Sequence, residues 1–249
     1  MLIALIVACA CGAQDYEPQP VDAWKDAKAG AFVKFKRTAK GEADGWTQIT
    51  MKEPGANGPI LELSASNAKQ PSQALGRAGV AGVFDVPADC AKATKDKAET
   101  VAVGAKKIEG TRWLVKGVNP GYGPNAGGRS VSGEIAVVTS ADVPGGLLKL
   151  EGTRTIDSFA GEKSWKVSWT LKGRLSSLSE KVTIKDKEYE CALFEVEAVS
   201  SRAEDPKITH QLWMHNDLPG RVAKRVVVRE TSKGKTTQEW VVDDFGPGK

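Results

Sequence analysis

The chain has 249 residues, of which 41% are hydrophobic and 27% are charged, and its formal net charge is +4. This length fits one large or two small domains, and the hydrophobic content is sufficient for a sizeable core. The positive excess is small and scattered along the chain, so it indicates a solvated surface and excludes a nucleic-acid-binding footprint.

The N-terminal residues, Met1 to Gly12, form an apolar run that is too short to span a bilayer. We predict a signal peptide over residues 1–13 and a polar linker over residues 14–21. The run Ile6 to Cys9 resembles a lipobox in which Cys9 would be lipidated, while Ala8-Cys9-Ala10 fits ordinary cleavage. Both alternatives predict an exported protein that is periplasmic, secreted or anchored to the outer membrane, with membrane contact only through a lipid on Cys9.

Two segments are helix candidates. Residues Pro20 to Gly30 predict one short helical turn that Gly30 ends at the C′ position. Residues Asn67 to Gly82 are a weaker candidate because they contain Gly and Pro.

Strands are predicted over residues 32–36, 46–51 and 60–63, and most clearly over residues 165–172. In that last segment Trp165, Val167, Trp169 and Leu171 alternate with Lys, Ser and Thr. Such a period of two is typical of an antiparallel strand with one buried face and one solvent-exposed face. The predicted fold class is therefore mainly β, with antiparallel meander units that form curved sheets or half-barrels and one or two short helices.

An internal repeat divides the chain into two predicted units, residues 22–149 and 150–249. The shared motif is Asp-[Val/Leu]-Pro-Gly, which begins at Asp142 and again at Asp217, an offset of 75. Pro144 and Pro219 fix φ at the second position of a turn, and Gly145 and Gly220 supply the positive φ of a type II turn. We expect each aspartate to bond the exposed amides, and we interpret both motifs as structural corners.

No catalytic signature is found. The two histidines, His210 and His215, have an odd spacing that places them on opposite faces of a strand, and we expect both at the surface or at an edge. There is no zinc-binding motif, so no metal and no cofactor are predicted. The glycine-rich segment Gly121 to Gly128 is not followed by Lys-Ser/Thr, which favours a flexible hairpin loop over a phosphate site. We predict that the protein is not an enzyme.

Outside the predicted signal peptide the cysteines are Cys90 and Cys191. In an exported protein they could form a disulfide. Two buried free thiols are an equally good alternative.

Seven tryptophans are many for this length. Five of them are candidate ligand-binding residues: Trp46, Trp113, Trp165, Trp169 and Trp213. The alternative interpretation is that they pack in the core. The hypothesis is a non-enzymatic exported protein that binds a hydrophobic ligand, a lipid or another envelope component. The alternative is a structural or protein-interaction module of the envelope without a small-molecule ligand.

Parts of the sequence also resemble known groups of exported proteins. Val182 to Cys191, Asp217 to Gly220 and Glu239 to Gly246 are similar to the C-terminal segments of a group of uncharacterised exported bacterial proteins. More distantly, the succession of strands resembles the lipoprotein-carrier half-barrel superfamily of the LolA, LolB and LppX types. That resemblance implies a curved sheet around an apolar cavity that holds acyl chains, and it transfers no catalytic residue.

Overall fold

The structure is a computed structural model of the whole chain. It describes residues 24, 27–39, 44–55, 58–66, 73–76, 91–119, 129–160 and 163–248. The predicted signal peptide, Cys9, Cys90 and the loop at residues 121–128 lie outside these ranges.

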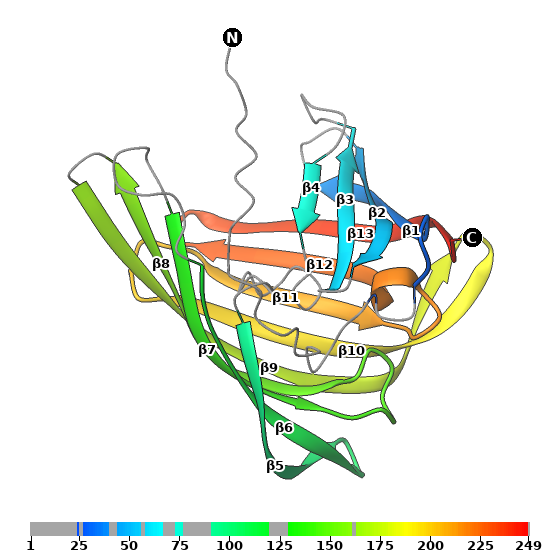
Figure 1. Cartoon of the computed structure of the whole chain (residues 1–249), viewed down its shortest axis with the longest axis horizontal. Coiled ribbons are helices and arrows are strands. Elements are labelled where there is room, and N and C mark those ends of the chain that lie inside the picture. Colours follow the sequence, from blue (N-terminus) through cyan, green and yellow to red (C-terminus); the bar gives the residue numbers. More distant parts are fainter. Residues whose placement is uncertain are drawn as a thin grey trace.

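The described residues form thirteen strands and one three-residue 3₁₀ turn (Figure 1). The elements are β1 (Phe32–Ala39), β2 (Gly45–Gly55), β3 (Gly58–Ala65), β4 (Gln73–Gly76), β5 (Ala91–Val103), β6 (Lys106–Asn119), β7 (Arg129–Thr139), β8 (Leu147–Ala160), β9 (Lys163–Ile184), β10 (Lys187–Ser200), β11 (Lys207–Met214), η4 (Pro219–Arg221), β12 (Val222–Thr231) and β13 (Gly234–Gly246). All the strands predicted from alternating sequence are present.

The helix prediction over residues 67–82 is wrong for the part that the structure describes. Strand β4 lies within it and pairs with β3, with Ala74 opposite Glu62 and Gln73 opposite Leu63. Pairing with a neighbouring strand outweighs the weak local propensity here. The other helix candidate lies partly outside the described residues, although Gly30 does have the predicted positive φ, 81°.

All thirteen strands belong to one antiparallel sheet, in the order β4-β3-β2-β1-β13-β12-β11-β10-β9-β8-β7-β6-β5. Strand β1 pairs along its whole length with β13, the last strand of the chain, from Phe32 opposite Gly246 to Ala39 opposite Gln238. The sheet is not closed, because β4 and β5 are edge strands. The predicted fold class, mainly β with a curved sheet, is confirmed, and both predicted repeat units contribute to the same sheet.

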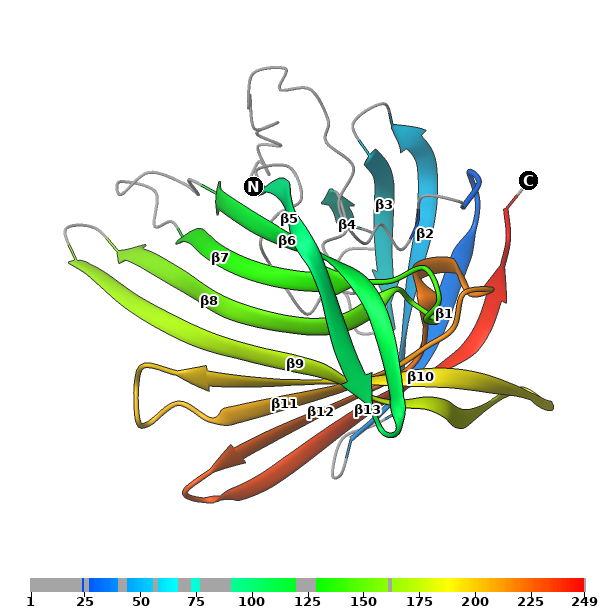
Figure 2. The ribbon, with the colours of Figure 1, turned by 90° about the horizontal axis from the view of Figure 1, so that it is seen from below.

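The sheet is strongly bent. Figure 2 shows β1–β4 on the right and β7–β8 on the left, above β10–β13, while β5 runs across the middle of the view in front of the central strands. The 22-residue strand β9 comes close to β5 and to β13, neither of which is its neighbour in the sheet. Right-handed twist accumulated over many strands, together with β-bulges, produces such bending.

The two Asp-x-Pro-Gly motifs form turns of the same geometry. Gly145 and Gly220 have φ of 76° and 72°, and in each turn the amide of the next residue donates to the carbonyl three residues earlier, at 2.9 and 2.8 Å. The flanking strand pairs share a register shift, at Val138/Thr139 in the first and Trp213/Met214 in the second. The predicted structural corners are therefore present, and the offset of 75 applies to the bulges as well.

Two apolar cores are built on this sheet. The larger joins strands β5 to β11 and the first Pro-Gly turn, with Phe194, Leu212 and Leu147 fully buried. The smaller lies where the tip of the β9–β10 hairpin meets β1–β3 and β13, and it includes Tyr189 and Cys191. At that tip Lys185 Nζ lies 2.8 Å from Asp244 Oδ1 on β13, which ties the hairpin to the last strand.

Candidate functional site

The strand register assigns side chains to two faces of the sheet, because directly opposed residues on neighbouring strands point to the same side. We call the face of Leu171, Phe194 and Leu212 the inner face, since these residues are buried. The opposite face, which includes the exposed Lys172 and half-buried Lys224, is the outer face.

Four rows of opposed residues cross the inner face. They are Leu175–Phe194–Leu212–Arg225–Trp240–Arg37; Trp113–Val137–Leu150–Gly173–Val196–His210–Val227–Gln238; Val115–Ile135–Gly152–Leu171–Ala198–Ile208–Arg229; and Arg154–Trp169–Ser200. They are predominantly apolar, and their charged residues are arginines; beyond the second row, Trp113 is also opposite Lys95 on the edge strand β5. The face thus combines hydrophobic area with positive charge.

Part of the inner face is accessible to solvent. Trp165 is 48% exposed, and other apolar side chains of this face on β8, β9 and β11 are half-buried. We call this set the inner-face patch. It consists of Ile156, Trp165, Val167, Trp169 and Ile208.

Beside this patch, β11 and β12 bring together His210, Arg225 and Arg229, which we call the basic cluster. Arg225 Nη2 lies 3.4 Å from His210 Nδ1, and its guanidinium carbon lies 5.3 Å from the centroid of the Trp240 ring. Arg229 Nη1 donates to Gln238 Oε1 at 3.0 Å. His210 is opposite Val227, midway between the two arginines along β12.

The surroundings of His210 disfavour its protonation. Burial is the larger cause and the positive charges of Arg225 and Arg229 are the others, and together they lower the pKa of His210 to about 4. The imidazole is therefore neutral at pH 7. The cluster then has two permanent positive charges, since arginine does not deprotonate.

The charges of the outer face are arranged differently. There the lysines form ion pairs with carboxylates on adjacent strands: Lys207 Nζ lies 2.6 Å from Glu197 Oε2, and Lys224 Nζ lies 3.1 Å from Glu239 Oε2. Each of these two lysines is therefore paired with a carboxylate on the outer face.

The five candidate tryptophans divide between the faces. Trp113, Trp165 and Trp169 share the inner face, where Trp113 Nε1 also donates to Thr139 Oγ1 at 3.1 Å. Trp46 and Trp213 are on the outer face, each with a lysine over its ring, Lys34 at 5.2 Å and Lys224 at 5.0 Å. A single inner-face site therefore cannot include all five.

The expectation that both histidines lie at the surface or an edge is wrong for His210. Strand β11 is central in the sheet, and His210 alternates with Ile208, Leu212 and Met214 on its buried face. This alternation is visible in the sequence, and it could have predicted that His210 shares a face with apolar residues. His215 follows β11; its Nδ1 accepts from the amide of Asp217 at 3.2 Å, and its ring packs edge-on against Tyr189.

Cys191 is a free, fully buried thiol, and burial raises its pKa to about 11. It is therefore poorly suited to act as a nucleophile. This state agrees with the thiol alternative for Cys191, while Cys90 lies outside the described residues.

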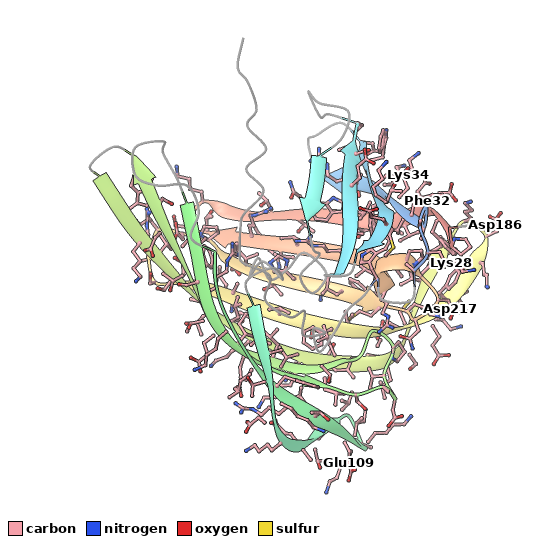
Figure 3. All side chains as sticks on the ribbon, viewed as in Figure 1. Lys28, Phe32, Lys34, Glu109, Asp186 and Asp217 are labelled. Carbon is pink, nitrogen blue, oxygen red and sulfur yellow. The ribbon has the colours of Figure 1, made fainter. Side chains whose placement is uncertain are left out.

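The turn aspartates do not have the expected role in the described contacts. The amide of Gly145 donates instead to Asn216 Oδ1, at 2.9 Å, so that a side chain of the second turn stabilises the first. Asp142 and Asp217 are exposed. Figure 3 shows Asp217 at the same end of the molecule as Asp186, which is at the tip of the β9–β10 hairpin.

In the part of the chain that the structure describes, no three His, Cys, Asp or Glu side chains are grouped so that they could hold a metal ion. A search of the same residues finds no helix with the length and apolar character needed to cross a bilayer. Comparison of the chain with protein-family models, curated proteins and solved structures found no match.

Proposed function

We propose that the protein is a non-enzymatic, exported protein of the cell envelope that binds a hydrophobic ligand or lipid on the inner face of its curved sheet. The observation that supports this most is the inner-face patch, in which the bulky Trp165 is 48% exposed beside other half-buried apolar side chains. Exposed apolar patches on otherwise polar proteins mark sites for ligands, membranes or partners.

The inner face is a better place for such a ligand than the outer face. The large hydrophobic residues that are exposed on the outer face, Trp46 on β2 and Val199 on β10, are separated by four intervening strands of the sheet. They do not form one patch, so they give less support to a protein-interaction module. Of the inner-face tryptophans, by contrast, Trp165 and Trp169 are both on β9, although Trp113 on β6 is separated from them by two strands.

The first test is native mass spectrometry of mature protein purified without detergent from an exporting host. Added mass that fragments into acyl species is the expected result. Bare protein that also fails to bind the neutral fluorophore N-phenylnaphthylamine would contradict the proposal.

A matched pair of variants locates the site. Trp165→Ser should weaken binding of N-phenylnaphthylamine about fivefold, because it removes apolar contact area from the inner-face patch. Trp46→Ser removes an exposed tryptophan from the outer face and should leave the affinity unchanged. Equal loss in both variants would place binding elsewhere.

A further inference from the structure

The excess positive charge of the chain is concentrated in one hairpin. Strands β5 and β6 with their turn, residues 91–119, contain seven lysines and arginines but only three aspartates and glutamates. This excess of four equals the formal net charge of the whole chain, so the rest of the chain carries equal numbers of acidic and basic residues. The hairpin is therefore a positively charged segment on an otherwise balanced chain.

Two of the three carboxylates in the hairpin are already engaged in ion pairs. Arg112 Nη1 donates to Asp96 Oδ2, and Arg112 Nε lies 3.6 Å from Glu99 Oε2. Glu99 Oε1 also lies 3.2 Å from Lys149 Nζ on β8. The third carboxylate, that of Glu109, belongs to an exposed residue. Arg112 and Lys149 thus compensate the charges of Asp96 and Glu99.

Four lysines of the hairpin are exposed and form no ion pair within the described part of the chain. We call them the hairpin lysines: Lys95 and Lys97 on β5, and Lys106 and Lys107 on β6. Strand β5 is an edge of the sheet, and the hairpin lies at the lower margin of the molecule in Figure 1, where Figure 3 labels Glu109. A large partner could therefore approach all four lysines.

The composition of this surface indicates the kind of anion. Lysine is a point charge on a flexible stem, whereas arginine has the fixed donor geometry that suits a single phosphate or carboxylate. The hairpin lysines therefore suit a surface of many mobile anionic groups. The aromatic residue of the hairpin, Trp113, is half-buried on the inner face, so it offers no exposed ring on which a base could stack. These features favour a bilayer with anionic lipids over a nucleic acid.

We infer that the hairpin lysines dock the protein on an anionic membrane surface. Such a surface attracts basic residues that come close to it, and salt screens the attraction. Lys95 is directly opposite Trp113, so docking brings an edge of the inner face to the bilayer. The inference goes beyond the proposed function and does not depend on it, and the contact is separate from any lipid on Cys9.

The test is sedimentation of the full chain with vesicles of phosphatidylcholine alone and with vesicles that contain about one third phosphatidylglycerol. The chain carries Cys9→Ser, so that no acyl anchor can form on that residue. We expect about tenfold stronger partition into the anionic vesicles at about 0.1 M salt. This preference should disappear at about 1 M salt, where the screening length falls to about 3 Å.

Two quadruple variants with the same change in net charge locate the docking surface. The first neutralises the hairpin lysines and should lose the preference for anionic vesicles; it combines Lys95→Gln, Lys97→Gln, Lys106→Gln and Lys107→Gln. The control neutralises four exposed lysines elsewhere and should keep the preference within about threefold; it combines Lys166→Gln, Lys172→Gln, Lys233→Gln and Lys235→Gln. Urea denaturation checks that each variant is folded.

Several outcomes would overturn the inference. Equal partition of the lysine-intact chain into both kinds of vesicle would do so, and so would equal losses in the two variants, because net charge alone would then cause the attraction. Retention on immobilised polyglutamate without vesicle binding would identify an acidic protein as the partner instead. Aggregation of the hairpin variant without vesicle binding by the lysine-intact chain would show that the lysines only protect the sheet edge.

The same protein separates this inference from the proposed function. If vesicle binding fails while N-phenylnaphthylamine still binds, only the docking surface is refuted. If the fluorophore fails to bind while the protein still docks on anionic vesicles, only the proposed function is refuted.

Discussion

The neutral state of His210 predicts a specific dependence of stability on pH. The pKa of an exposed histidine is 6.5, and burial beside Arg225 and Arg229 lowers it to about 4 in the folded protein. Between these values the unfolded chain binds a proton that the folded protein does not, so the free energy of unfolding must fall as the pH is lowered from 6.5 to 4. Above 6.5 and below 4 this contribution is constant.

The magnitude follows from the same two pKa values. Their difference, about 2.5, corresponds to at most about 3 kcal/mol at roughly 1.36 kcal/mol per pKa unit. This is a large fraction of the roughly 5–15 kcal/mol that stabilises a typical domain.

The assay is urea denaturation of ligand-free wild-type protein and of His210→Asn between about pH 7 and about pH 4. Asparagine retains an acceptor oxygen toward Arg225 and does not titrate. The carboxylates titrate in both proteins and cancel in the difference. The stability of the wild type relative to the variant should decrease by about 2–3 kcal/mol over this range. A difference that stays constant with pH would refute the half-buried, charge-flanked position of His210.

Three further predictions concern packing. Gly152→Ala should destabilise the protein by at least about 2 kcal/mol, because a Cβ there would lie 2.7 Å or less from main-chain atoms of β7. Gly104→Asn is the control: the position has open space around it and a φ of 59°, so this substitution should cost about 1 kcal/mol or less. Thermal unfolding of both variants measures the two costs. Asn216→Ala should lower the free energy of unfolding by about 1–2 kcal/mol, because it removes the acceptor of the Gly145 amide. Asp217→Ala should leave the free energy of unfolding nearly unchanged, as measured by urea denaturation. Equal losses in the two variants would indicate that Asp217, too, stabilises the turn. Cys191→Ser should not change the number of thiols that a disulfide reagent labels in native protein, and it should lower that number by one after unfolding.

Features that depend on local sequence were predictable. The strands around Phe32 and Trp165 were found from alternation alone, and the Pro-Gly turns from the φ values that those residues favour. The weak helix prediction that includes β4 failed because pairing with β3 decides its conformation, and such pairing is not encoded in a local pattern.

The candidate site was only partly predictable for a related reason. Alternation within one strand shows which residues share a face, but it does not show which faces of different strands coincide. Trp165 and Trp213 are both in strands, yet the register of β9, β10 and β11 places them on opposite faces. The proximity of His210 and Arg225 likewise arises from the β11–β12 register.

The pairing of β1 with β13 has a consequence for folding kinetics. Every other adjacent pair in the described sheet consists of strands consecutive in the chain, and only the β1–β13 pair joins segments more than 190 residues apart, Ala39 to Gln238 at the nearest. The two sheet edges, β4 and β5, are consecutive in sequence. A circular permutant opened between residues 76 and 91, with the original ends joined by a linker, would therefore run as one uninterrupted meander from edge to edge. Because long-range contacts slow folding through their loop-closure entropy, that permutant should fold faster than the natural connectivity while retaining the same strand pairs.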